Sequence, residues 1–192
     1  DTVRIMFVHV PSAWMALLVY TTMALASAAG LIWKSPLSYL TAKAAAPIGA
    51  SFTFIALITG ALWGQPMWGT WWEWDPKLTS FLILFLFYLG YIILWAAVED
   101  PDTAADLTSV LCIVGSVFAV LSRYATNFWN QGLHQDASLS IDKEEHVADV
   151  FYYPLIVVMA GFVLLFVALV LLNTRSEIMK RRAGAIMARS RI

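Results

Sequence analysis

Five long stretches of this chain carry almost no Asp, Glu, Lys or Arg, and this pattern limits the fold more than any other feature. A helix needs about 20 apolar residues to cross a bilayer, and open sheet edges cannot persist in lipid. The chain is 60% hydrophobic and 13% charged, far from the balance of a soluble domain. We therefore predict an all-α polytopic membrane protein with spans at about 11–33, 46–63, 78–98, 107–124 and 151–173.

Several functional classes are excluded by what the sequence lacks. A net charge of -1 gives no argument for nucleic-acid binding. No C-x-x-C-H haem-attachment motif and no G-x-x-x-x-G-K-[ST] nucleotide loop occurs, so the chain is neither a c-type cytochrome nor an ATPase. The single cysteine, Cys112, cannot form an internal disulfide and is interpreted as a packing residue. We expect a protein that is not an enzyme.

The distribution of basic residues predicts the orientation of the spans, because Lys and Arg gather on the cytoplasmic side. With the basic tail 174–192 inside, the inner segments hold eight cations and the outer segments four. The inner cations are Lys34, Lys43, Arg175, Lys180, Arg181, Arg182, Arg189 and Arg191, and the outer ones are Arg4, Lys77, Arg123 and Lys143.

This orientation places Asp1 on the outer side. No secretory signal peptide is visible there. We expect a further transmembrane helix upstream, which would make six in the full protein. The outer segments are then the start of the chain up to Pro11, which we expect to open the first span, the loop 64–77 and the loop 125–150.

The outer loop 64–77 contains an unusual concentration of tryptophan in the sequence WGTWWEWDPKLTS, from Trp68 to Ser80. An aromatic belt would place indoles at both membrane faces, yet seven of the nine tryptophans fall at outer ends. The alternative is a platform for a large flat ligand such as a porphyrin. If the segment is helical, Trp68, Trp71 and Trp72 share one face, and Asp75 with Pro76 would cap the next helix.

A porphyrin would also need axial ligands for its iron and cations for its propionates. All three histidines, His9, His134 and His146, lie in outer segments. His146 is interpreted as part of a solvated helix face, since Asp142 and Glu145 resemble a capping box. The residue types do not choose among Arg4, Lys77 and Arg123 as propionate partners, nor do they assign Glu73.

The tryptophan motif resembles WGxWWxWDx(R/K)LTS of the haem-handling proteins of cytochrome c biogenesis. The stretches FVHVPSAW, APIGASFTFIALITGALWGQPMWGTWW and FWNQGLHQ are also similar to the haem exporter protein C family of the cytochrome c maturation pathway. The similarity covers essentially the whole chain. At the (R/K) position this chain has Lys77, where many members are expected to carry Arg; lysine keeps the charge but lacks the bidentate geometry of a guanidinium.

The resemblance implies a specific site and a specific set of partners. It implies that His9 and His134 ligate the iron of a b-type haem, and that the haem lies against Trp68, Gly69, Thr70, Trp71, Trp72, Trp74 and Asp75. It also implies a bacterial inner membrane location with the haem on the periplasmic side. The implied partners are a periplasmic haem chaperone, an ATP-binding cassette ATPase with its membrane subunit, and a small single-span subunit.

The resulting hypothesis is that the chain binds haem at the outer face and presents it to the chaperone. An electron-transfer cytochrome b would need histidines within its spans, and none occurs there. Two alternatives stay open. One is a membrane subunit that transports haem or another hydrophobic ligand, although the middles of the spans lack ionisable residues. The other is a haem sensor or store without transfer.

Overall fold

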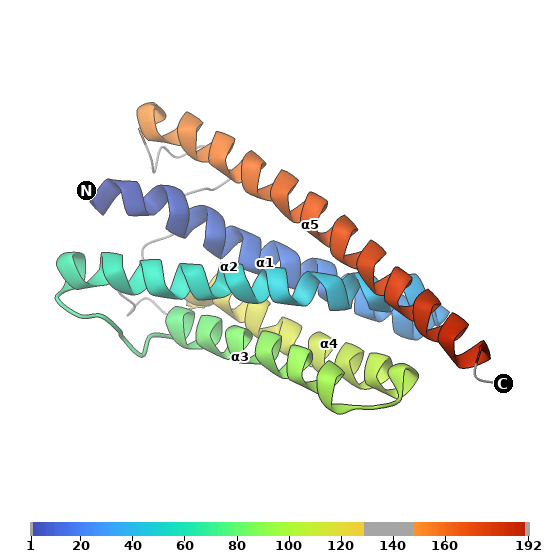
Figure 1. Cartoon of the computed structure of the whole chain (residues 1–192). Coiled ribbons are helices and arrows are strands. Elements are labelled where there is room, and N and C mark those ends of the chain that lie inside the picture. Colours follow the sequence, from blue (N-terminus) through green and yellow to red (C-terminus); the bar gives the residue numbers. More distant parts are fainter. Residues whose placement is uncertain (1, 129–147, 191–192) are drawn as a thin grey trace.

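The computed structural model describes residues 2–128 and 148–190, which form five α-helices (Figure 1). The helices are α1 (Thr2–Trp33), α2 (Pro36–Trp68), α3 (Pro76–Ala97), α4 (Pro101–Phe128) and α5 (Asp149–Arg189). Within these residues all five helices are long and apolar enough to cross a membrane, and no strand is present. The predicted fold class, an all-α polytopic membrane protein, is confirmed.

Three of the helices begin in the same way, with a polar residue followed by proline. Ser35, Asp75 and Asp100 precede Pro36, Pro76 and Pro101, respectively. The Asp75 carboxylate accepts a hydrogen bond from the Leu78 amide at 2.6 Å, and that of Asp100 accepts one from Thr103 at 2.8 Å. These side chains satisfy amides that have no partner within the helix, while proline provides a helical φ without needing a donor. The predicted capping role of Asp75 is confirmed.

The first helix differs from the prediction, because Pro11 does not open it. α1 begins at Thr2, so Pro11 lies inside the helix and His9 is a helical residue. Proline interrupts a helix by removing one amide donor and crowding the preceding turn, yet the chain stays helical on both sides. Consequently, His9 is held by a helix rather than by a loop.

The helices pack as two antiparallel hairpins, and α5 lies against the first of them. α1 pairs mainly with α2 and α3 with α4, while α4 also packs against α1, and α5 contacts α2 and α1. The start of α1, the α2–α3 loop and the start of α5 lie at one end of the bundle, and the chain finishes at the other end (Figure 1). We call these the tryptophan end and the basic end.

The centre of the bundle is built from tyrosine rings that lie against glycines of neighbouring helices. Tyr88 of α3 occupies the space beside Gly49 of α2, and its hydroxyl donates to the Ala16 carbonyl of α1 at 2.7 Å. Tyr20 of α1 lies beside Gly115 of α4 and meets Tyr88 edge to face, with ring centroids 4.9 Å apart. Both rings are fully buried. Small residues thus let large rings join four helices.

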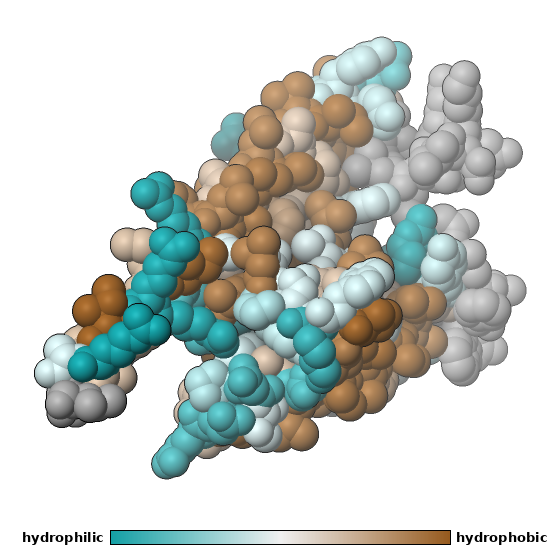
Figure 2. Space-filling view, turned by 90° about the vertical axis from the view of Figure 1, so that its right-hand side faces the viewer, coloured by the Kyte–Doolittle hydropathy of each residue, from teal (hydrophilic) through white to brown (hydrophobic). Residues whose placement is uncertain are grey.

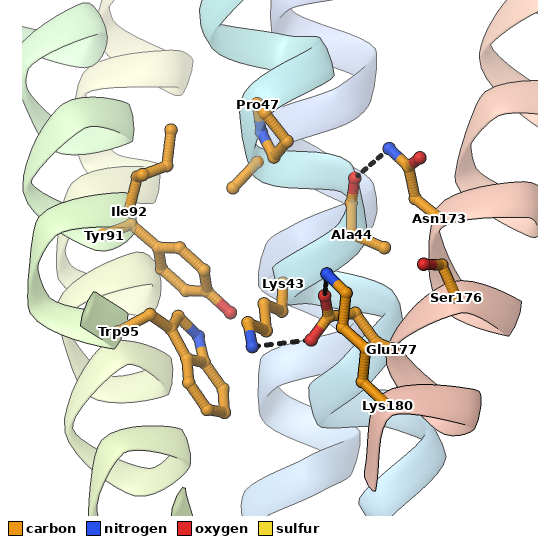
Figure 3. A pocket seen from close by; sticks show the side chains of 11 residues that line it. Lys43, Ala44, Pro47, Tyr91, Ile92, Trp95, Asn173, Ser176, Glu177 and Lys180 are labelled. Carbon is orange, nitrogen blue, oxygen red and sulfur yellow. Dashed lines mark hydrogen bonds and ion pairs between the residues drawn. The ribbon is translucent and has the colours of Figure 1, made fainter. Parts of the chain in front are cut away.

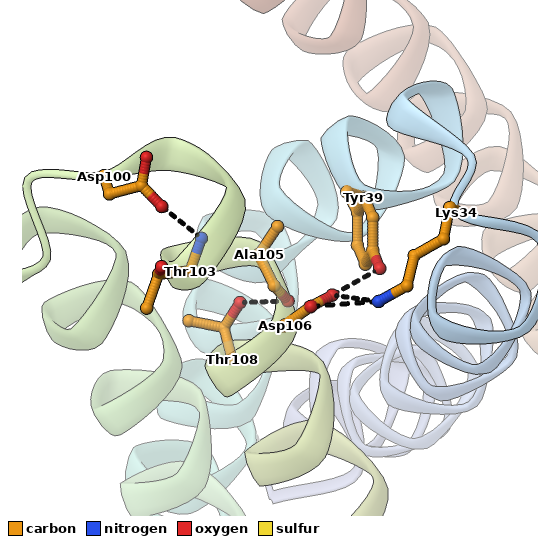
Figure 4. A network of polar contacts seen from close by, with 7 residues as sticks. All are labelled: Lys34, Tyr39, Asp100, Thr103, Ala105, Asp106 and Thr108. Atoms are coloured by element: carbon orange, nitrogen blue, oxygen red, sulfur yellow. Dashed lines mark hydrogen bonds and ion pairs between the residues drawn. The ribbon is translucent and has the colours of Figure 1, made fainter.

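The basic end carries polar contacts that join the two hairpins. Asp106 of α4 accepts hydrogen bonds from Lys34 at 2.9 Å and from the Tyr39 hydroxyl at 2.6 Å (Figure 4). Lys34 forms the turn between α1 and α2 and has a φ of 49°. Figure 2 looks onto this end and shows hydrophilic residues gathered there in front of a largely hydrophobic surface. This distribution fits helix ends that emerge from a membrane.

Candidate functional site

The tryptophan loop starts where Gly69 ends α2. Gly69 has a φ of 77°, a conformation that glycine adopts without strain, and its amide donates to the Gln65 carbonyl at 2.9 Å. Residues 69–75 are therefore not helical. The expectation that Trp68, Trp71 and Trp72 share one helical face is wrong, because only Trp68 belongs to a helix.

The tryptophans of the loop fall into two groups by exposure. Trp68 packs edge to face on Trp63 with centroids 5.2 Å apart, and it lies over Gly64, where a Cβ would come within 3.2 Å of its ring. Trp71 and Trp74 are exposed, at 59% and 72%. Trp68 therefore fixes the base of the loop, whereas Trp71 and Trp74 present indole surface outward.

Internal contacts give the exposed part of the loop a defined shape. The Thr70 hydroxyl donates to the Trp72 carbonyl at 2.8 Å and accepts from the Trp72 amide at 3.3 Å. Trp72 is half-buried and meets the ring of Trp74 edge to face, with centroids 5.5 Å apart. Its indole N–H is buried with no hydrogen-bond acceptor among the described residues. Thr70 and Trp72 thus support the loop from within.

His9 of α1 is oriented by α2. Its Nδ1 lies 3.0 Å from the Ala56 carbonyl oxygen and 3.2 Å from the Thr59 hydroxyl oxygen. A carbonyl oxygen can only accept, so Nδ1 carries the proton and donates it. The Thr59 hydroxyl donates its own proton to Ile55 at 2.6 Å and is therefore also an acceptor toward His9. In the neutral ring Nε2 then bears the lone pair, the form of histidine that binds a metal.

Gly60 makes room for this imidazole. A Cβ at position 60 would lie 2.9 Å from His9 Cε1, closer than side chains normally approach. Gly60 and Gly64 are one helical turn apart on α2, so they share a face. This face holds His9 at one glycine and Trp68 at the next. The structure thereby brings together the predicted histidine of the first segment and the base of the tryptophan loop.

The second predicted iron ligand, His134, lies outside the described residues, as does His146. Within residues 2–128 and 148–190, no three His, Cys, Asp or Glu side chains gather into a metal site. The part of the site that the structure describes therefore consists of His9 and the loop.

The three candidate cations have different surroundings. Arg123 of α4 lies over two aromatic rings, 5.4 Å from the centroid of Tyr124 and 6.0 Å from that of Trp14 on α1. Arg4 lies in the first turn of α1, and Lys77 lies in the first turn of α3, directly after the loop. All three lie toward the tryptophan end, and these positions do not select one of them as the propionate partner.

The sequence alone did not identify Ala56 and Thr59 as residues that orient His9. A signal for part of this contact was present in the spacing of Ala56, Gly60 and Gly64, which places small residues four apart on one face. That spacing predicts close approach of a neighbour, and the neighbour is the segment that carries His9. Every residue has a backbone carbonyl, so the residue type of Ala56 does not indicate that it accepts a hydrogen bond from His9. Only the structure identifies this acceptor.

The fold and the site together define a class: a multi-pass helical membrane protein with a histidine and exposed indoles at one end of its bundle. The family model described as Heme exporter protein C matches residues 1–189. The chain belongs to the heme exporter protein C family.

Individual members of the family support this assignment. The heme exporter protein C of Rhodobacter capsulatus is 65% identical over 191 residues, which cover 100% of this chain and 79% of that protein. That of Paracoccus denitrificans is 66% identical over 188 residues, covering 98% and 78%. The Escherichia coli K12 protein of the same name is 40% identical over 185 residues, covering 95% and 74%. The similarity thus includes the helices and the loop described above.

Proposed function

We propose that this protein binds b-type haem at the tryptophan end of its bundle, and that this end faces the periplasm from the inner membrane. The observation that carries the proposal is the orientation of His9. Its Nδ1–H is held by the Ala56 carbonyl, which leaves Nε2 as the basic nitrogen. Metal-binding histidines almost always have their second nitrogen fixed in this way. The family name, which refers to heme export, supports haem as the ligand.

The residues present fit a porphyrin. His9 would provide one axial ligand, and His134 is proposed as the other from its place in the motif GLHQ. Trp71 and Trp74 would cover one face or edge of the macrocycle, because their exposed indoles offer flat apolar surface. When bound, the haem supplies the iron and the reactive periphery. The role of this chain is to hold it at a membrane surface where a second protein can reach it.

This position suits presentation of haem better than electron transfer within the membrane. The start of α1, which carries His9, and the tryptophan loop lie at one end of the bundle (Figure 1), whereas the buried rings of Tyr20 and Tyr88 pack between the helices. We propose transfer to a periplasmic haem chaperone for c-type cytochrome biogenesis. The family name, which refers to heme export, supports a place in a haem-handling complex. We propose that its other members are an ATP-binding cassette ATPase, its membrane subunit and a small single-span subunit. ATP hydrolysis would belong to those partners.

Exposed tryptophans of the loop should contribute directly to haem retention. We expect the Trp71→Ala/Trp74→Ala protein to bind haem roughly tenfold more weakly, since each aromatic contact contributes about 0.5–1.5 kcal/mol. The measurement is the Soret absorbance per protein after purification in detergent. Trp33→Ala is the matched control, because Trp33 is 73% exposed at the basic end. An unchanged Soret band in the double variant would show that these tryptophans do not bind haem and would favour the interpretation of the loop as an aromatic anchor at the membrane surface.

Transfer to the chaperone should produce contacts at the tryptophan loop. A photo-crosslinking residue at position 71 is expected to capture the chaperone in cells that make haem and much less in cells that do not. Position 102, exposed at the basic end, provides the control. Crosslinks that do not depend on haem, or that form only at position 102, would favour a haem store or sensor over a protein that transfers haem.

A further inference from the structure

A cavity of about 310 Å³ lies near the basic end, between α2, α3 and α5 (Figure 3). It is separate from the site described above, since none of its lining residues comes from α1 or from the tryptophan loop. Ala46, Pro47 and Ile92 form an apolar wall. Lys43, Glu177 and Lys180 form a charged rim. The cavity therefore combines an apolar wall with a charged rim, which suits an amphipathic ligand.

The charged rim carries an excess of one positive charge. Glu177 accepts a hydrogen bond from the Lys43 ammonium at 2.6 Å and one from Lys180 at 2.8 Å. The Lys43 ammonium also lies 4.8 Å from the centroid of the Trp95 ring. Two cations around one carboxylate leave several N–H donors and one unit of charge for a further partner. A ligand with a single negative charge would balance the group.

Two further polar groups in the cavity wall are not fully satisfied. The Tyr91 hydroxyl and the Trp95 indole N–H lie near each other, and the hydroxyl also lies near Thr108 of α4, yet neither group makes a hydrogen bond of standard geometry to a described residue. Tyr91 is only 1% exposed, and its hydroxyl points toward Lys43 (Figure 3). Leaving such groups unsatisfied is costly, so each needs an explanation. The Tyr91 hydroxyl is therefore the nearest additional donor for a ligand placed beside Lys43 (Figure 3).

The cavity lies at the depth where the apolar parts of its helices end. The charge-free stretch of α5 finishes at Thr174, directly after the cavity residue Asn173, and that of α2 begins directly after Lys43. In a bilayer this boundary is the level at which lipid headgroups meet the acyl chains. The space is adequate for a headgroup but not for an additional helix, whose diameter is about 10 Å.

We propose that this cavity binds the phosphodiester of an anionic phospholipid from the leaflet at the basic end. The phosphate oxygens accept from Lys43, Lys180, Tyr91 and Trp95, and the acyl chains run along Pro47 and Ile92. Basic pockets between transmembrane helices are a recognised way to hold anionic headgroups. The lipid would fill the space between α3 and α5 and connect both helices to α2.

The proposal is tested by titrating the purified protein in detergent with phosphatidylglycerol and counting bound lipid by native mass spectrometry. We expect Lys43→Gln/Lys180→Gln to weaken binding by at least about tenfold, because two charge-assisted contacts are lost. Tyr91→Phe should also weaken it by at least about tenfold, through the loss of one hydrogen bond to a charged group. Lys34→Gln is the matched control, since Lys34 is an exposed lysine at the same end, outside the cavity.

Two further arms distinguish the source of the phosphate and the selectivity for charge. Inorganic phosphate at millimolar concentration should not displace the lipid, and phosphatidylcholine should bind more weakly than phosphatidylglycerol. Displacement by inorganic phosphate would show a site for free anions and overturn the lipid assignment. Binding that is unchanged in Tyr91→Phe and in the double lysine variant would overturn the site itself. If the double variant fails to fold, Tyr91→Phe alone decides.

Discussion

Purified His9→Ala protein is expected to lose nearly all of its Soret absorbance. His9 is the described residue best placed to bind iron, because the Ala56 carbonyl fixes its Nδ1–H and leaves Nε2 basic. Even partners that only orient a metal-binding histidine contribute about 10–100-fold to affinity, so loss of the ligand should exceed about 100-fold. The measurement is the absorption spectrum of protein purified in detergent, normalised to protein concentration.

Three controls separate iron ligation from a structural role of His9. Added imidazole should restore part of the Soret band in His9→Ala, because a small ligand can enter the vacated space. His146→Ala should retain haem, as His146 is interpreted as a solvated residue. Thr59→Val should have a small effect, since the Ala56 carbonyl remains as the shorter contact. Normal haem content in His9→Ala, with loss in His146→Ala, would refute the assignment.

The second large effect is expected at Gly49, far from the site. A Cβ at this position would overlap the ring of Tyr88, which is fully buried and fixed by its hydrogen bond to Ala16. The ring has no empty space to enter, so Gly49→Ala must separate α2 from α3. We expect a loss of about 1–3 kcal/mol in stability, as for other overpacked interiors. A lower midpoint of thermal unfolding in detergent is the measurement.

Gly161 of α5 provides the matched control for this substitution. In the described part of the chain, no atom outside the neighbouring backbone of α5 lies within 4 Å of a Cβ built there, so Gly161→Ala should be neutral or slightly stabilising through its higher helix propensity. Tyr88→Phe is also informative, because it keeps the ring and removes only the hydroxyl. Equal midpoints for Gly49→Ala and Gly161→Ala would show that the tyrosine–glycine contact does not limit the stability of the bundle.

Much of the architecture was predictable because the membrane imposes simple rules. Stretches without charge marked the five helices, and Asp75 followed by Pro76 marked the start of α3. Predictions at helix ends were less successful where the sequence offered two interpretations. The expectation that Pro11 opens the first span is wrong, because Pro11 lies inside α1, and a shared helical face for Trp68, Trp71 and Trp72 is ruled out because α2 ends at Gly69. A φ value and a position along a helix are not encoded by residue spacing alone.

The candidate site was predictable in its residue types but not in its geometry. The motif pointed to His9 and to the tryptophan loop, whereas the partner of the imidazole is a backbone carbonyl of α2. Trp71 is exposed and Trp72 is half-buried because of tertiary packing. Two adjacent tryptophans look the same in the sequence, so this difference in burial could not be predicted. The cavity near Tyr91 was not anticipated, because its residues come from three distant segments.

The length of α5 has a mechanical consequence. The helix runs from Asp149 to Arg189 with Pro154 in its second turn, and the part beyond Asn173 extends roughly 24 Å past the apolar window. A continuous helix is stiff, so a change of tilt in the part at the basic end also tilts the part within the bundle by a similar angle. The part of α5 beyond Asn173 carries Arg181, Arg182 and Arg189. A protein that bound these arginines would change the tilt of α5, and this change would extend along the helix to the end of the bundle where His9 is held.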